Sequence, residues 1–74
     1  MVRVMFGKKF RQIGLKIAYY RKRKALKQME VAERAGISCS YLSKIETGKV
    51  RYSLAVLMQI ARALEIDPGR LLMG

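Results

Sequence analysis

Two glycines, Gly36 and Gly48, divide the middle of this chain into two short helical segments and constrain its fold more than any other feature. Glycine adopts positive φ without steric cost, so it commonly ends a helix. Ahead of Gly36, Val31 and Ala32 supply the inward-facing positions of a helix predicted over residues 28–35. That helix is short and ends sharply.

A second short helix is predicted over residues 39–47, between the two glycines. The Ser38 hydroxyl can cap its first turn, and Leu42 and Ile45 point inward from one face. The opposite face carries small polar residues where a helix surface usually carries long charged side chains. Such a face can approach another surface closely.

Helical periodicity continues on both sides of this pair. Phe10, Ile13, Ile17 and Tyr20 recur every three or four residues, which predicts a helix that ends within residues 21–27.

Toward the C-terminus, Ser53 can cap a fourth helix. Its inward stripe is predicted to comprise Leu54, Leu57, Ile60, Ala61 and Leu64. Asp67 and Pro68 are predicted as the N-cap and first residue of a last short helix. This helix is predicted to end in Leu71, Leu72 and Met73. The whole pattern predicts an all-α domain of five helices over residues 10–74.

Residues 1–9 lack this period. Val2, Val4 and Phe6 alternate with other residues as in a short strand. We expect a flexible N-terminal arm here, and an ordered strand that pairs or swaps with a partner is the alternative.

The charge of the chain points to a polyanionic partner. Lys and Arg number 16 against 5 Asp and Glu, which gives a net charge of +11, and ten of the basic residues precede the first acid, Glu30. A field of this sign favours nucleic acid, an acidic protein or an anionic membrane.

The composition also excludes several kinds of site. The chain has no His and a single cysteine, Cys39, so neither an internal disulfide nor a metal site is expected. Paired carboxylates, a glycine-rich phosphate loop and a nucleophile–base pair are all missing, so we predict no enzyme, no cofactor and no small-molecule ligand. No apolar run approaches the roughly 20 residues of a membrane span, and a cytoplasmic protein is expected.

The central residues resemble the helix-turn-helix of phage-repressor and Cro-like (XRE-type) regulators. The resemblance rests on the spacing of Gln28, Ala32, Gly36, Ile37, Leu42 and Ile45, and it extends over about residues 10–72. It implies a lambda-repressor-like domain in which the two short helices form the helix-turn-helix. Ala32 fits independently, because helices that cross at about 90–120° leave room only for a small side chain.

The resemblance implies that the helix over residues 39–47 lies in the major groove of DNA. The implied base contacts are Cys39, Ser40, Ser43 and Lys44. Lys44 is the main candidate for sequence specificity, since lysine can donate to the guanine O6 and N7 atoms; a solvated or phosphate-bound charge is the alternative. For Cys39 a redox sensor is a second interpretation.

A further set of residues flanks the motif and is predicted to contact phosphates. It comprises Arg23, Lys24, Lys27, Gln28, Ser38, Tyr41, Lys49, Arg51 and Tyr52. Solvated surface charges are the alternative for the basic members. The resemblance implies that Gln28 contacts a phosphate and braces the helix over residues 39–47, and the alternative is that it is simply a good helix former. Two positions depart from the family pattern, because Lys27 replaces an N-cap Thr or Ser and Tyr52 replaces a Pro. A missing cap oxygen costs about 1 kcal/mol.

The resemblance also implies a partly buried ion pair between Arg21 and Glu46; the alternative is that Arg21 faces a phosphate and Glu46 is a solvated acid. Removing one partner of a buried pair can cost roughly 3–5 kcal/mol, so Arg21→Ala is predicted to destabilise the fold.

The predicted function is that of a transcriptional regulator binding double-stranded DNA, as a homodimer on a pseudo-palindromic operator with half-sites about 34 Å apart. The predicted dimer interface is Met58, Leu71, Leu72 and Met73, which could instead close the core. The main alternative is a protein-interaction module, such as an antitoxin or a subunit of a larger regulator. RNA binding lacks an exposed aromatic platform, and membrane binding would need the apolar face that the core uses.

Overall fold

Apolar side chains from all five described helices meet in a single core. The computed structural model describes residues 2–73, which form five helices and no strand. These are α1 (Val2–Arg23), α2 (Gln28–Ala35), α3 (Cys39–Glu46), α4 (Leu54–Leu64) and α5 (Gly69–Leu72). The predicted all-α fold is confirmed.

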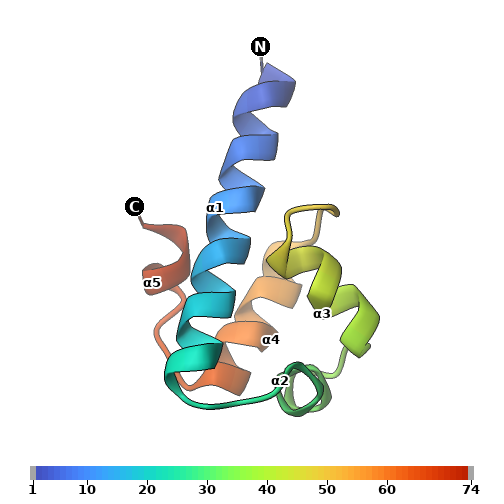
Figure 1. Cartoon of the computed structure of the whole chain (residues 1–74). Coiled ribbons are helices and arrows are strands. Elements are labelled where there is room, and N and C mark those ends of the chain that lie inside the picture. The colour runs from blue at the N-terminus through green and yellow to red at the C-terminus, as the bar shows by residue number, and fades with distance from the viewer. Residues whose placement is uncertain (1, 74) are drawn as a thin grey trace.

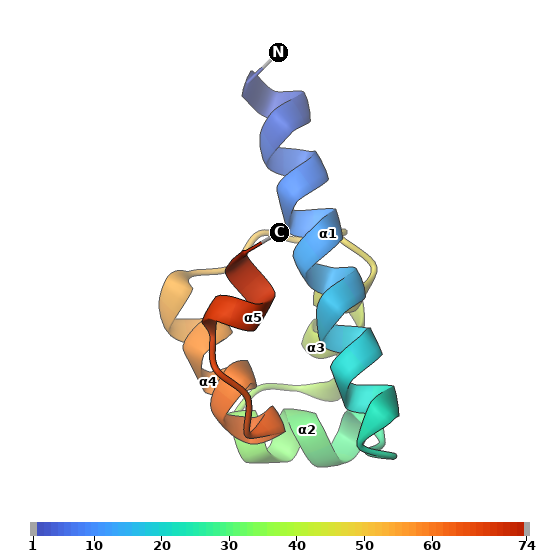
Figure 2. The ribbon, with the colours of Figure 1, turned by 90° about the vertical axis from the view of Figure 1, so that its left-hand side faces the viewer.

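Helix α1 runs through the middle of the molecule and its first turns project beyond the other helices (Figures 1 and 2). It packs mainly on α3, whereas α2 packs mainly on α4. Helix α5 lies on the opposite side of α1 from α3 (Figure 1). The fully buried side chains of the core are Ile17, Val31, Leu42, Ile45, Ile60, Leu64 and Leu71.

The helix ends in the centre of the chain follow the predicted capping chemistry. Gly36 ends α2 with φ of 73°, and Gly48 follows α3 with φ of 72°. The Ser38 Oγ accepts a hydrogen bond from the N–H of Tyr41 at 3.0 Å. The Ser53 Oγ caps α4 in the same way, from an N–H at 3.2 Å. These four predictions are confirmed.

The structure differs from the prediction at the N-terminus. Residues 2–9 belong to α1 and not to a strand, and the first turns of this helix project beyond the other helices (Figure 2), while Met1 lies outside the described residues. A strand needs a partner to satisfy its backbone, and the described chain offers none. A helix that already exists gains one backbone hydrogen bond for each residue added, so extending α1 is the available solution.

Two details of the last helices also differ. Leu54 is 63% exposed, because it begins α4 at the edge of the core where no helix covers it. The turn before α5 is capped by Asp67, whose Oδ1 accepts from the N–H of Gly69 at 2.9 Å. Helix α5 starts at Gly69, one residue later than predicted, and Met73 lies just past its end.

Gly14 allows α1 and α3 to approach closely. A Cβ atom at this position would overlap the carbonyl oxygen of Ile45 and lie 2.9 Å from that of Glu46. Both obstacles are backbone atoms, so no side-chain movement could relieve the overlap. The end of α3 therefore rests directly on α1.

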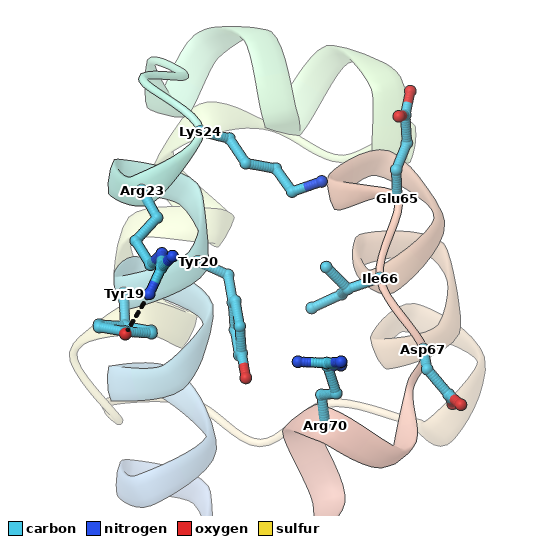
Figure 3. A pocket seen from close by; sticks show the side chains of 8 residues that line it. All are labelled: Tyr19, Tyr20, Arg23, Lys24, Glu65, Ile66, Asp67 and Arg70. Atoms are coloured by element: carbon cyan, nitrogen blue, oxygen red, sulfur yellow. Dashed lines mark hydrogen bonds between the residues drawn. The ribbon is translucent and has the colours of Figure 1, made fainter.

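A wide surface cavity separates the second half of α1 from the connection between α4 and α5 (Figure 3). Its volume is about 730 Å³, and side chains of both acids and bases line it. Within residues 2–73, no helix has the length and apolar character required to cross a membrane.

Candidate nucleic-acid interface

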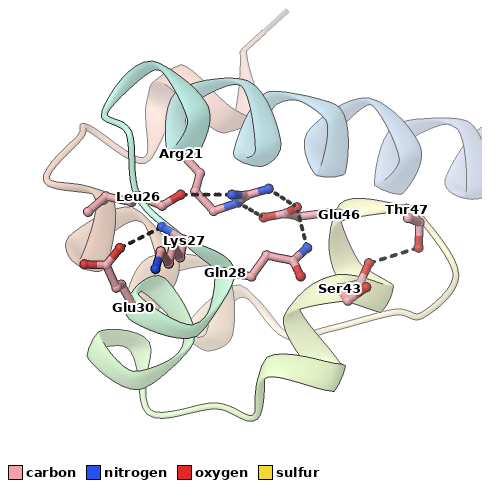
Figure 4. A network of polar contacts seen from close by, with 8 residues as sticks. All are labelled: Arg21, Leu26, Lys27, Gln28, Glu30, Ser43, Glu46 and Thr47. Carbon is pink, nitrogen blue, oxygen red and sulfur yellow. Dashed lines mark hydrogen bonds and ion pairs between the residues drawn. The ribbon is translucent and has the colours of Figure 1, made fainter.

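A network of charge-assisted hydrogen bonds joins α1, α2 and α3 (Figure 4). The Arg21 Nε donates to Glu46 Oε2 at 2.8 Å, and its Nη2 donates to Glu46 Oε1 at 3.1 Å. The Arg21 Nη1 donates to the carbonyl of Leu26 at 2.9 Å. The two charged side chains are only 12% and 5% exposed. The predicted ion pair is confirmed, and it is bidentate.

Gln28 completes this network from the first position of α2. Its Nε2 donates to Glu46 Oε1 at 2.9 Å, so the glutamine braces α3 directly. Together with Arg21 it fixes the angle between α2 and α3, which is the angle that a helix-turn-helix must hold.

The start of α2 is capped by Glu30, a residue outside the predicted site. Glu30 Oε1 accepts from the backbone N–H of Lys27 at 2.8 Å. A lysine side chain has no acceptor, so only this half of a capping box is made. The glutamate three residues after the N-cap was the available signal, and it compensates in part for the missing cap oxygen at Lys27.

Helix α3 presents a narrow polar face to solvent. Leu42, Ile45 and Glu46 are buried, whereas Ser40 and Lys44 are exposed. Cys39 and Ser43 are half-buried and lie beside them, since residues four apart share one face of a helix. The four residues predicted to contact bases therefore form one continuous surface, on which Lys44 carries the single charge.

Several residues of the predicted phosphate set surround this surface. Ser38 and Lys27 lie at the start of α3 and α2, and Lys49 and Arg51 lie in the segment after α3; all four are exposed. The Tyr41 hydroxyl donates to the carbonyl of Arg51 at 3.4 Å and is half-buried. Four of these residues thus lie on α3 or in the segments that flank it, and Lys27 lines a surface pocket together with Cys39.

Tyr52 does not belong to this set. Its hydroxyl is covered and has no hydrogen-bond partner among the described residues, and its ring packs edge-on against Phe10 with centroids 4.9 Å apart. Burial, with a smaller contribution from Tyr41, raises the pKa of Tyr52 to about 12. The prediction of a phosphate contact is wrong here, because the aromatic ring serves the core.

Arg23 and Lys24 also lie elsewhere. Both line the cavity between α1 and the α4–α5 connection, which no residue of α3 reaches (Figure 3). The Arg23 Nη1 donates to the Tyr19 hydroxyl at 2.9 Å, its guanidinium lies 5.6 Å from that ring, and the hydrogen bond raises the pKa of Arg23. The structure does not bring these two cations together with the recognition surface.

An apolar surface covers the outer side of α4 and α5. Met58 is 45% exposed and Met73 is 74% exposed. Leu72 is 37% exposed and lines a groove of about 220 Å³ together with Leu54. Leu71 is fully buried, so its predicted place in an interface is wrong: the short α5 uses this side chain to close the core. Leu54, which was predicted to be internal, joins the exposed surface instead.

The sequence model of the helix-turn-helix family matches residues 17–71 of the chain, which contain the whole network and the polar face of α3. The chain belongs to this family, of the XRE (Cro/C1) type. The family consists of DNA-binding transcriptional regulators and not of enzymes. The described residues contain no group of three or more His, Cys, Asp or Glu that could hold a metal ion.

The chain is similar in sequence to regulators from phages and bacteria. The immunity repressor protein of Bacillus phage phi105 is 41% identical over 55 residues, which are 74% of this chain and 38% of that protein. The ImmF control region 10 kDa protein of the same phage is 40% identical over 77% of this chain and 63% of its own length. The regulator SinR of Bacillus subtilis is 38% identical over 81% of this chain and 55% of its own. The matched region thus spans less than two thirds of the length of each of these three relatives.

Two crystal structures share the arrangement of helices. The restriction-modification controller protein C.AhdI from Aeromonas hydrophila has a TM-score of 0.82 and 31% identity, over 84% of this chain and 94% of that one. The clp gene regulator ClgR from C. glutamicum has a TM-score of 0.84 and 26% identity, over 88% and 84%. The helix-turn-helix domain of this chain is therefore typical of its family.

Proposed function

We propose that the chain regulates transcription by inserting α3 into the major groove of an operator. The observation that carries this proposal is the polar face of α3, which is held outward by the network of Arg21, Gln28 and Glu46. A major groove about 12 Å wide admits one helix only if the side chains toward its floor are short or flexible. Serine, cysteine and lysine satisfy that condition.

The expected contacts divide by chemistry. Lys44 can donate to guanine O6 and N7, while Ser40, Ser43 and Cys39 make weaker and less selective contacts. Lys27, Ser38, Lys49 and Arg51 are proposed to hold phosphates on either side, and Tyr41 can join them by exchanging its long hydrogen bond to the Arg51 carbonyl for one to a phosphate. One N–H of the Gln28 amide is used by Glu46, so a phosphate contact of Gln28 has to use the other N–H. Phosphate contacts should therefore supply much of the affinity, and DNA shape part of the specificity.

We further propose that the functional unit is a homodimer on a pseudo-palindromic operator. One helix of eight residues reads too few base pairs to be specific alone, and a two-fold axis doubles the contacts. The exposed apolar surface formed by Leu54, Met58, Leu72 and Met73 is a suitable interface, since Leu72 and Leu54 border an apolar groove. We also propose that the chain acts in the cytoplasm, where a DNA-binding regulator would meet its operator.

The test is affinity for a random duplex and for a duplex selected from a pool, each measured over a range of salt concentrations. We expect log K to fall steeply with log salt, and the selected duplex to bind at least about 1000-fold more tightly. Lys44→Ala should reduce that preference more than it reduces nonspecific binding. Arg62→Ala, which removes an exposed charge from α4, is the matched control.

An absence of sequence preference at every salt concentration would reject the operator-binding function. The domain would then be a protein-interaction module. Selective binding with one protein per duplex would reject only the dimer.

A further inference from the structure

Three cations converge on a surface cavity between α1 and the segment that follows α3. The cavity measures about 510 Å³ and is lined by Lys8, Arg11 and Lys49, together with Gly7, Thr47 and Gly48. No acidic side chain lines it. Figure 1 shows this part of α1 running past the end of α3, and Figure 2 shows that it projects beyond the remaining helices.

Backbone packing holds two of these cations side by side. Gly48 has φ of 72°, and a Cβ atom there would lie 3.0 Å from the Cα of Arg11. The segment after α3 is therefore pressed against α1, which places Lys49 beside Arg11. Because Lys8, Arg11 and Lys49 line the same cavity, an anion bound there would be attracted by all three positive charges.

The described residues contain no internal anion for this cluster. Among the residues whose side chains the structure describes, 7–73, neither Lys8 nor Arg11 forms an ion pair, and the salt bridge found there joins Arg21 to Glu46. The Asp67 carboxylate is used elsewhere, because it caps the turn before α5. Lys8, Arg11 and Lys49 are all exposed and free to meet a ligand.

Two other cations of α1, Lys9 and Lys16, have a different role. Lys9 Nζ donates to the carbonyl of Leu72 at 2.9 Å, and Lys16 Nζ donates to that of Met73. These two lysines thus satisfy carbonyl groups at the end of α5, where a positive charge also suits the helix dipole. Helix α1 therefore uses one face to hold α5 and leaves Lys8 and Arg11 on the side of α3.

We propose that this cavity binds a backbone phosphate of the same DNA duplex that α3 reads. The proposal rests on the proposed function and adds Lys8 and Arg11 to the contacts. Helix α3 has eight residues and is therefore about 12 Å long, close to the width of the major groove. Thr47 caps the C-terminal end of α3, so the cavity lies where one wall of the groove passes that end.

The experiment compares three proteins on the selected duplex: the parent, Lys8→Ala/Arg11→Ala, and the control Arg62→Ala/Arg70→Ala. Both double variants lose two exposed positive charges, but the control loses them from α4 and α5. Each lost phosphate contact should lower the slope of log K against log salt by about 0.9. We expect a decrease of about one to two for the α1 variant and little change for the control.

A second readout locates the contact. Ethylation of single phosphates should weaken binding of the parent at one or two positions per half-site where it no longer affects the α1 variant. The variant Lys8→Arg/Arg11→Lys keeps both charges and should show the slope and the ethylation pattern of the parent. Circular dichroism of each variant verifies the fold.

Three results would overturn the proposal. Equal slopes of log K against log salt for the α1 variant and the control would mean that the three cations act only through the overall positive charge of the protein. If the parent still bound the selected duplex selectively, the proposed function would stand and only this inference would fail. An unchanged ethylation pattern would exclude the phosphate contact. Stabilisation of the parent but not the α1 variant by millimolar inorganic phosphate, with an unchanged ethylation pattern, would assign the cavity to a free anion.

Discussion

Arg21→Met should destabilise the fold strongly, because it leaves the carboxylate of Glu46 buried without a counter-charge. That carboxylate is 5% exposed and accepts two hydrogen bonds from Arg21 and one from Gln28. The substitution removes the two charged donors and also the donor to the Leu26 carbonyl. Methionine fills much of the arginine stem's volume, so the loss is mainly electrostatic.

The expected loss is large relative to the total stability. Leaving one partner of a buried pair uncompensated costs about 3–5 kcal/mol. A domain of 74 residues has a free energy of unfolding of about 4–11 kcal/mol, at roughly 0.05–0.15 kcal/mol per residue. The variant should therefore lose about a quarter or more of its stability, and a loss of about 3 kcal/mol would lower Tm by about 12 °C or more.

The assay is urea unfolding followed by circular dichroism, with Lys22→Met as the control. Lys22 is the exposed neighbour of Arg21, and its substitution should change stability by less than about 0.5 kcal/mol. The double variant Arg21→Met/Glu46→Leu should recover most of the loss, because an apolar pair can replace a buried ion pair at little cost.

Two results would refute this reasoning. A loss below about 1 kcal/mol for Arg21→Met would mean that water or Gln28 alone satisfies Glu46. A double variant as unstable as the sum of its single variants would show that the two residues are not coupled.

Other substitutions test the packing. Gly14→Ala should lower the free energy of unfolding in urea by about 1–3 kcal/mol or more, because the new Cβ meets the backbone of α3. The control Gly7→Ala has open space around it and should raise the free energy of unfolding by about 0.5–1 kcal/mol. A Gly14→Ala variant as stable as the parent would contradict the close approach of α1 and α3. Tyr52→Phe should raise stability by about 1 kcal/mol by removing an unsatisfied hydroxyl. The unfolded Tyr52 ionises near pH 10 and the folded one near 12, so the stability of the parent should fall across this window, and an identical fall in the phenylalanine variant would exclude Tyr52 as the cause. In analytical ultracentrifugation the Leu72→Asp variant should be a monomer, with the circular dichroism of the parent. The Leu71→Ala variant should instead lose about 2–5 kcal/mol of stability, because Leu71 is buried. A folded, dimeric Leu72→Asp variant would show that the interface lies elsewhere.

The sequence by itself determined the helices and their ends between residues 10 and 73. Gly36, Ser38, Gly48 and Ser53 act on backbone groups within about four positions, so their effect is local and can be inferred without knowing the fold. The inward positions of the helices followed from periodicity for the same reason. Leu54 was the exception, since whether a stripe is covered at its end depends on the neighbouring helices.

Only the tertiary structure decided which member of a chemically similar set does what. Local sequence does not distinguish Lys8 from Lys9, yet one faces the cavity beside α3 and the other binds α5. Leu71 and Leu72 are adjacent and identical, yet one is buried and the other exposed. These assignments depend on how helices distant in sequence pack against each other, because a rotation of about 100° per residue turns neighbouring side chains toward different surroundings.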